Sequence, residues 1–317
     1  MLTLRTLATA VLALSLAAAG AATANAQTYP AKPLKIIVTW NAGGTTDITA
    51  RLFAPELARE LGQPVAVVNI VGGGGALGTK EALDAPKDGY TLLMTTSGNH
   101  ILTPLNKKVG YTQADFIPIG QLSSRTLALA VRTDSPWKTL ADLQKDAKAN
   151  PGKYTFGAVP NVLPFLTLSA WTKMAGISLV HVPQQGGAPG VTSTLGGHLH
   201  MVPESLASVL SHVRDGKLRV LAVFNQQRDP AAPDLPTAAE QGFKVYGNPF
   251  TGVAVAKGTP QPVVDKLVAA TAKIAKDPAF QERMKKAGDV VSYLDAKTFG
   301  EVWARDWAAY EPILAKK

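Results

Sequence analysis

The sequence predicts an α/β protein with two lobes, each a mainly parallel sheet flanked by helices, and a cleft between the lobes. Short apolar runs alternate with helical stretches along the chain, a pattern typical of parallel sheets covered by helices. The chain has 317 residues, enough for two packed lobes of ordinary size. Its apolar fraction, 46%, is that of a globular protein.

The first 26 residues predict export. Arg5 is the only charge before an apolar run at 7–22, and Ala24-Asn25-Ala26 offers a small-residue cleavage site. This is the pattern of a secretory signal peptide. The apolar run is roughly 15 residues long, shorter than the ~20 that a membrane-spanning helix needs. We therefore expect cleavage after Ala26 and a mature chain in the periplasm.

The first part of the mature chain alternates strictly between strands and helices. Buried apolar runs predict strands at 34–40, 65–70 and 90–95. Apolar residues at helical spacing predict helices at 47–61 and 76–83.

The remaining elements repeat this alternation. Strands are predicted at 127–131, 154–158, 179–182, 201–202, 220–224 and 253–256. Helices are predicted at 140–149, 166–175, 191–195, 206–215, 263–276, 278–287 and 299–314. A proline-rich stretch at 229–236 lies between the last two strands.

The net charge of +9 indicates an anionic partner. Lysines and arginines are scattered and the chain is exported, so we expect a small anion and no nucleic acid. The lack of cysteine excludes disulfides, thiolate nucleophiles and cysteine metal sites. His198 and His200 have the spacing of a chelating pair, but no third ligand is evident in the sequence. We therefore expect neither a metal nor a cofactor.

The turn between the first strand and helix has the chemistry of an anion site. Gly43 and Gly44 let backbone N–H groups point outward, and Thr45 and Thr46 add hydroxyl donors. The helix N-terminus behind them carries partial positive charge, which suits a carboxylate or phosphate. Asp47 is expected to cap free N–H groups rather than contact an anion. An ordinary capped turn explains the same residues, so this segment alone does not establish an anion-binding site.

A glycine motif follows the second strand. Gly73, Gly75 and Gly78 spell G-x-G-x-x-G before a helix, which is the context of a dinucleotide site. We reject that interpretation because the motif does not follow the first strand and no acidic residue ends the next one. An exported protein also has little access to NAD. A turn where backbones or a ligand approach closely fits better.

The third strand ends in hydroxyl and amide side chains. Ser97 and His100 lie close together here, which raises the alternative of a periplasmic hydrolase. The G-x-S-x-G sequence of a nucleophile elbow is absent. We expect instead a loop that hydrogen-bonds an anion, with no catalytic residue and no enzyme activity.

Short segments spread in order over the mature chain share the pattern of a known family. They lie at 29–33, 43–47, 61–63, 72–75, 88–93, 149–153, 181–183, 186–189, 216–219, 235–237 and 258–260. As a set they resemble the Bug-type substrate-binding receptors of tripartite tricarboxylate transporters. The resemblance implies a type II-like periplasmic binding protein, with a first lobe at 27–126 plus 249–317 and a second at 127–248.

The resemblance also implies the function. Such a receptor captures a dicarboxylate, tricarboxylate, amino acid or aromatic acid and delivers it to inner-membrane transporter subunits. The alternative within binding proteins is a periplasmic sensor for a signalling system. We expect a monomer.

The implied ligand-binding residues lie in loops of both lobes. In lobe 1 they are Trp40, Ala42, Gly43, Gly44, Thr45, Thr46, Thr96, Ser97, Gly98 and Asn99. In lobe 2 they are Val159, Asn161, Gln184, Gly186, Gly187, Ala188 and Glu204.

Three positions depart from the family pattern. The loop at 158–164 is more apolar than usual, Trp40 stands where Phe is usual, and Glu204 follows Pro203 where Phe-Asp-Asn is common. The first two changes predict a carboxylate ligand with an apolar or aromatic body. Glu204 either answers an amine of the ligand or fills the space itself.

Overall fold

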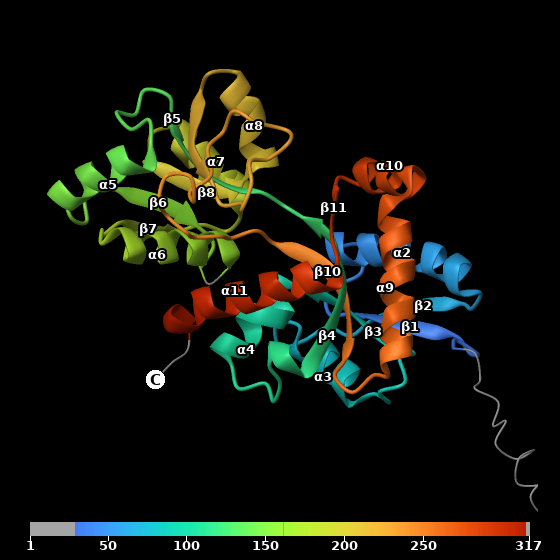
Figure 1. Cartoon of the computed structure of the whole chain (residues 1–317). Coiled ribbons are helices and arrows are strands. Elements are labelled where there is room, and N and C mark those ends of the chain that lie inside the picture. Colours follow the sequence, from blue (N-terminus) through green and yellow to red (C-terminus); the bar gives the residue numbers. More distant parts are fainter. Residues whose placement is uncertain (1–28, 161, 315–317) are drawn as a thin grey trace, which may run out of the picture.

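Two separate sheets organise the chain into two lobes (Figure 1). The structure is a computed structural model that describes residues 29–160 and 162–314, so the predicted signal peptide and Asn161 lie outside the described residues. We call the part built on the six-stranded sheet lobe 1 and the part built on the five-stranded sheet lobe 2. Among the described residues, no helix combines the length and apolar character that crossing a membrane requires.

The sheet of lobe 1 has the strand order β11-β4-β10-β3-β1-β2. Its strands are β1 (Leu34–Val38), β2 (Val65–Asn69), β3 (Thr91–Thr96), β4 (Phe116–Ser124), β10 (Phe250–Ala256) and β11 (Val291–Leu294). β1 pairs parallel with β2 and with β3. β10 pairs antiparallel with β3 and β4, and β11 pairs antiparallel with β4.

Helices cover both faces of this sheet, because alternate strand residues point to opposite faces. Ile36 of β1 belongs to a core with α2, α9 and α10, whereas Ile37 belongs to a core with α3 and α11. The helical segments of lobe 1 are α2 (Thr45–Leu61), α3 (Ala76–Asp84), η1 (Gly98–Leu102), α4 (Thr103–Asn106), η2 (Gln113–Asp115), α9 (Gln261–Lys276), α10 (Pro278–Lys286) and α11 (Ala296–Leu314).

Lobe 2 repeats the three-layer arrangement on a sheet of order β7-β6-β8-β5-β9. Its strands are β5 (Leu127–Arg132), β6 (Thr155–Ala158), β7 (Val180–Pro183), β8 (Met201–Ser205) and β9 (Leu218–Val223). Its helices are α5 (Leu140–Ala149), α6 (Leu163–Ala175), α7 (Gly187–Leu195) and α8 (Leu206–Arg214). Leu129 of β5 packs with α5 and α6, whereas Ala130 packs with α7 and α8.

Strand direction brings functional loops of both lobes to one place. In lobe 1, β1, β2 and β3 end at the same edge where β4 ends and β10 begins. In lobe 2, β6, β7, β8 and β9 end where β5 begins. Only Arg125 and Thr126 separate β4 from β5, so the carboxyl edges of the two sheets lie on either side of this crossing.

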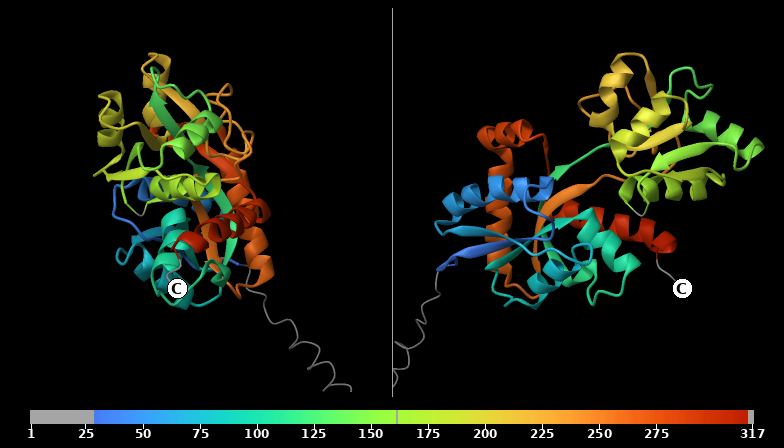
Figure 2. Two further views of the ribbon diagram at one scale, coloured as in Figure 1. Left: turned by 90° about the vertical axis from the view of Figure 1, so that its left-hand side faces the viewer. Right: turned by 180° about the vertical axis from the view of Figure 1, so that it is seen from behind.

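The two chain crossings are held together. The Arg125 amide donates a hydrogen bond of 2.9 Å to the carbonyl of Pro249, in the segment that returns from β9 to β10. Figure 2 shows the green and orange crossings side by side between the lobes. The chain therefore passes between the lobes in two adjacent segments.

The predicted fold class is confirmed, with differences in strand content. Both sheets are mixed, because the strands that carry the chain between the lobes pair antiparallel with their neighbours. β4 and β11 were absent from the expected elements, as was the helical segment from Gly98 to Asn106. β4 contains Pro118, Gly120 and Gln121, which interrupt the apolar run that identifies a buried strand.

Candidate functional site at the facing sheet edges

The turn after β1 presents hydrogen-bond donors at the edge of lobe 1. Ala42, Gly43 and Gly44 are exposed, and Thr45 and Thr46 are partly exposed. Gly44 is the N-cap residue of α2, and no side chain caps this helix. Because first-turn amides have no carbonyl partner within a helix, they are available to an anion here.

Asp47 holds the conformation of this turn from its buried side. Its carboxylate is buried and accepts hydrogen bonds of 2.9 Å from the Gly43 amide, Arg51 Nε and Asn69 Nδ2. Burial opposes ionisation, but the hydrogen bonds from Arg51, Gly43 and Asn69 lower the pKa of Asp47 below its ordinary value. The expectation that Asp47 serves the turn rather than the ligand agrees with this geometry.

Asn69 is a supporting residue that the sequence interpretation missed. Besides Asp47, its amide donates a 3.0 Å hydrogen bond to the carbonyl of Trp40. Asn69 ends β2, so it lies beside the end of β1 in the parallel pair. A polar residue at the carboxyl end of a predicted strand was the available signal.

Trp40 joins the first loop to the third. Its indole Nε1 donates a 3.2 Å hydrogen bond to Thr96 Oγ1 at the end of β3. The ring lies over Gly98, where an added Cβ would come within 2.9 Å of Trp40 Cζ2. Trp40 remains partly exposed, so its ring forms an apolar wall beside the donor-rich turn.

Asn99 is engaged inside lobe 1. Its Oδ1 accepts 2.7 Å hydrogen bonds from the amide and hydroxyl of Thr96, and its Nδ2 donates to Thr79 Oγ1. The side chain is fully buried. Asn99 therefore shapes the loop, and Thr96 and Gly98 lie nearer to its surface.

Ser97 and His100 do not form a nucleophile–base pair. The Ser97 hydroxyl accepts from the Phe250 amide at 3.1 Å, at the start of the returning strand. His100 is fully buried between Trp303 and Phe116, and its ring nitrogens have no hydrogen-bond partner in the part of the chain described. Burial lowers the pKa of His100 to about 3. This geometry gives the hydrolase alternative no support.

The glycine motif after β2 serves close packing. An added Cβ at Gly75 would lie 2.6 Å from Asn99 Cβ, and one at Gly78 would lie 2.6 Å from the carbonyl oxygen of Ile70. Gly75 also has a φ of +90°, a conformation that favours glycine. The motif therefore brings α3 against the site loops, which agrees with the expected close approach of backbones.

The loops after β6 and β7 form the lobe 2 side of the candidate site. The amide of Gln184 donates to the carbonyl of Ala158 at 3.0 Å, joining the loops after β6 and β7. Val159, Gln184 and Gly186 are partly exposed and Ala188 is exposed. Val159 and Ala188 therefore bring apolar side chains to this edge.

Glu204 occupies the space in front of α7. Its Oε2 lies 2.0 Å from the position where a Cβ at Gly187 would stand, and its Oε1 accepts a 2.8 Å hydrogen bond from the Ser205 amide. Gly187 is the first residue of α7. Glu204 therefore fills the space that a side chain at position 187 would need, and its role toward a ligand stays a prediction.

His198 and His200 of lobe 2 do not act together. His200 Nδ1 lies 2.9 Å from Thr155 Oγ1, and the His198 ring packs on Gly196. Within the described ranges, no cluster of three His, Asp or Glu side chains has the arrangement of a metal site.

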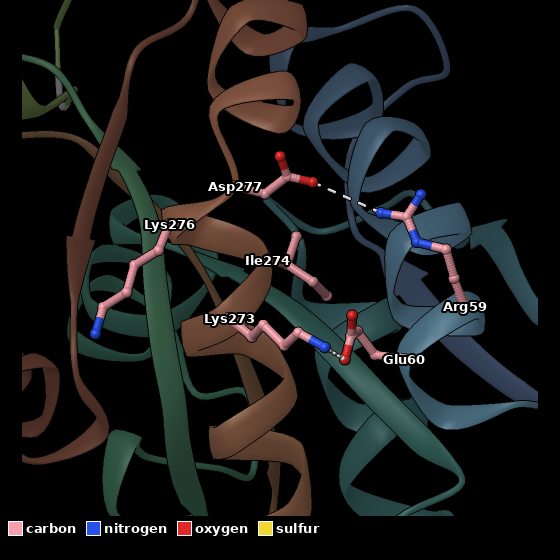
Figure 3. Close-up of a pocket in the computed structure, with 6 residues that line it drawn as sticks. All are labelled: Arg59, Glu60, Lys273, Ile274, Lys276 and Asp277. Atoms are coloured by element: carbon pink, nitrogen blue, oxygen red, sulfur yellow. Dashed lines mark hydrogen bonds and ion pairs between the residues drawn. The ribbon is translucent and has the colours of Figure 1, made fainter.

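A surface hollow lies away from these edges (Figure 3). It is lined by Arg59, Glu60, Lys273, Ile274, Lys276 and Asp277. Lys273 pairs with Glu60 at 2.8 Å and Arg59 with Asp277 at 3.6 Å, so its charges largely satisfy one another. Arg59 is 14 residues along α2 from Thr45, about 20 Å from the donor-rich turn.

Comparison with known proteins places the chain in a family. Residues 49–316 match the family described as "Tripartite tricarboxylate transporter family receptor" (TctC). BugT of Bordetella pertussis is 34% identical over 262 residues, which cover 80% of this chain and 80% of BugT.

Solved structures of similar proteins agree with this family assignment. A ligand-free TctC solute-binding protein from Polaromonas is 32% identical with a TM-score of 0.84, covering 92% of this chain and all of that one. R. palustris Rpa4515 with adipate is 26% identical with a TM-score of 0.64, covering 90% of this chain and 96% of that one. The chain therefore belongs to the TctC family of tripartite tricarboxylate transporter receptors, as its sequence predicted.

Proposed function

We propose that this protein is a periplasmic receptor that binds a small carboxylate between its lobes and delivers it to a tripartite tricarboxylate-type transporter. The observation that carries the proposal is the uncapped N-terminus of α2, flanked by Thr45 and Thr46 at the facing sheet edges. Export of the chain through its first 26 residues and cleavage after Ala26 belong to the same proposal.

The chemistry of the turn suits a carboxylate. Backbone amides at a helix start and two hydroxyls supply donors, and hydrogen bonds to a charged group contribute roughly 1.5–3 kcal/mol each. Micromolar affinity needs about 8 kcal/mol net. A few such bonds and apolar contact reach this value after the cost of immobilising the ligand. The adipate bound by Rpa4515, a relative of 26% identity, supports a carboxylate as the ligand class.

We infer that ligand binding closes the lobes about the paired crossings. The TM-score is higher with the ligand-free Polaromonas protein than with the adipate complex, 0.84 against 0.64, at similar coverage. A rotation between lobes lowers a whole-chain score while each lobe stays alike, so this difference supports an open form here. A ligand that touches both edges stabilises the closed form by its differential affinity.

The walls of the site favour an apolar ligand body. The indole of Trp40 is fixed by Thr96 beside the donors, and the opposite edge carries Val159 and Ala188. We propose a carboxylate with an aliphatic or aromatic body rather than a small polar acid such as malate.

Native mass spectrometry of freshly purified protein tests the proposal first, by detecting a co-purified small acid. Calorimetry on protein stripped by unfolding and refolding then measures a panel of aliphatic, aromatic and hydroxylated acids. We expect micromolar binding of at least one acid with an apolar body. No heat with any acid would contradict a receptor role, and binding of malate-type acids alone would contradict the apolar preference.

Transport is tested in cells. Deleting the gene should abolish uptake of the best-binding acid. Normal uptake with loss of gene induction would instead identify a sensor.

A further inference from the structure

The N-terminus of α7 faces the carboxyl edge of lobe 2, and the protein fills it with its own carboxylate. Gly186, the N-cap residue, has extended backbone and no side chain caps the helix. Glu204 Oε2 and Oε1 lie 2.0 Å and 3.0 Å from the ideal Cβ position of Gly187. The carboxylate is thus seated against the backbone of the first helical residue, which only a glycine permits.

The Glu204 carboxylate lacks an ion-pair partner in the part of the chain that the structure describes. Across residues 29–160 and 162–314, no Lys, Arg or His lies within ion-pair distance of Glu204. The hydrogen-bond donor that the described residues offer it is the Ser205 amide, at 2.8 Å. The carboxylate therefore stands beside the partial positive charge of the α7 N-terminus, without a hydrogen bond to the α7 amides among the described residues.

The register places Glu204 where a ligand would meet lobe 2. Glu204 pairs with Ala128 and is one residue from the end of β8, at the edge that adjoins the crossing to lobe 1. Gly187 begins α7 in the loop that follows β7 at this edge. A ligand whose first carboxylate sits at α2 directs its far end toward this part of lobe 2.

We propose that Glu204 is a specificity-determining residue that rejects a second carboxylate, so that this receptor takes monocarboxylates. The proposal rests on the carboxylate-binding function proposed above and adds the charge of the ligand's far end. A second ligand carboxylate would meet a like charge in a partly dehydrated space, in the place beside the start of α7 that Glu204 already occupies. A methyl or an ammonium group meets no such repulsion.

The test uses straight-chain acids that differ only at the far end. Calorimetry compares hexanoate, adipate and 6-aminohexanoate on stripped protein, and matched pairs of other chain lengths extend the series. In the wild type we expect at least a tenfold weaker affinity for the dicarboxylate of a pair than for the monocarboxylate, with the amino acid at least as tight as the monocarboxylate.

Variants of Glu204 and Gly187 then separate the effect of the Glu204 charge from the effect of the space that its side chain fills. Glu204→Gln keeps the size and removes the charge, and Glu204→Ala also frees the α7 N-terminus. Both should reduce the ratio of dicarboxylate to monocarboxylate dissociation constants at least tenfold, and Glu204→Ala the more. Gly187→Ala keeps the charge but displaces it, and should also change the ratio. Asp215→Asn, at the far end of α8, is the matched control and should leave the ratio unaltered.

The outcomes are distinct. Equal binding of both acids of a pair by the wild type, or a ratio that Glu204→Gln and Glu204→Ala leave unchanged in folded protein, overturns this inference and leaves the receptor function standing. No binding of any acid overturns the proposed function itself, and the inference with it.

Discussion

At the scale of single residues, Thr46 and Asp47 have different roles in the turn at the start of α2. Asp47 is buried and satisfied by Gly43, Arg51 and Asn69, whereas Thr46 is partly exposed at the helix start. Asp47 therefore holds the turn, and we propose that Thr46 faces the ligand.

Thr46→Val removes a hydroxyl but keeps the shape of the side chain. If the hydroxyl donates to the ligand carboxylate, affinity should fall about 10- to 100-fold, because such a bond contributes roughly 1.5–3 kcal/mol. Calorimetry with the best-binding acid measures the change. Thr133→Val, at an exposed position after β5, is the control and should bind as the wild type does. Unaltered affinity in Thr46→Val would remove this hydroxyl from the site.

Asp47→Asn should lower the free energy of unfolding by about 2 kcal/mol at pH 7, because it weakens hydrogen bonds to a charged group. The pKa of Asp47 is lowered in the folded state. Its contribution is therefore present above the unfolded pKa near ~4 and is lost as the pH falls through the folded pKa. Urea unfolding from pH 7 to pH 3 measures the difference in the free energy of unfolding between the wild type and Asp47→Asn. This difference should become smaller only below about pH 4. A difference that stays constant with pH would show that the charge of Asp47 does not cause it.

At the scale of elements, much of the fold was predictable because helix and strand periods were regular. The strand predicted at 65–70 is β2, and the helix predicted at 263–276 is α9, which begins two residues earlier at Gln261. β4 escaped prediction because Pro118 and Gln121 break its apolar pattern. Antiparallel pairing escaped it too, since a hydrophobic period carries no information on strand direction.

The site was predictable only as a set of loops. Glycine and hydroxyl residues after strands predict a binding edge, and Trp40 and Thr96 do lie together there. The inward role of Asn99 and the support from Asn69 depend on contacts between strands that are distant in sequence. Local patterns do not encode such contacts.

The contact between α3 and the sheet predicts the effect of a single methyl group. A Cβ at Gly78 would lie 2.6 Å from the backbone oxygen of Ile70, which has no freedom to move away. Gly78→Ala should therefore lower the free energy of unfolding by about 1–2 kcal/mol despite better helix propensity. Gly300→Ala in α11, 3.4 Å from Pro118, is the control and should be neutral or stabilising. Equal stability of the two variants would contradict this packing.

Helix α11 carries a buried carboxylate. Burial raises the pKa of Asp306 to about 6, although Arg305 opposes this effect. The folded state then holds a proton that the unfolded state has lost between about pH 4 and pH 6, so stability should fall as the pH rises through this window. Asp306→Asn should be more stable than the wild type by up to ~3 kcal/mol at pH 7.5 and similar to it at pH 4. Thermal unfolding at both pH values measures this, and equal shifts at both would contradict a raised pKa.

At the scale of the whole molecule, lobe 2 rests on α11 of lobe 1. Tyr310 lies 2.9 Å from Thr167 of α6 and donates to the carbonyl of Tyr246 in the returning crossing at 3.0 Å. Leu163 and Leu166 of α6 share a buried cluster with Trp303 of α11. Figure 1 shows α11 lying beneath α6. The closure proposed above must therefore keep or rearrange these contacts between α6 and α11.

Closure of the two lobes on a ligand predicts a more compact protein in solution. Small-angle X-ray scattering should give a lower radius of gyration when the best-binding acid saturates the protein, because the two lobes approach each other. A non-binding acid of the same charge is the control. An unchanged radius at saturation would mean that the ligand binds without bringing the lobes together.

The central claim is that a carboxylate binds at the start of α2 and is covered by lobe 2. A crystal structure with the best-binding acid tests it most directly. The predicted result is a ligand carboxylate within hydrogen-bond distance of the amides or hydroxyls of Thr45 and Thr46, with Gln184 or Glu204 beside the same molecule. A ligand bound elsewhere, such as in the hollow at Lys273, or with its carboxylate turned away from α2, would contradict it.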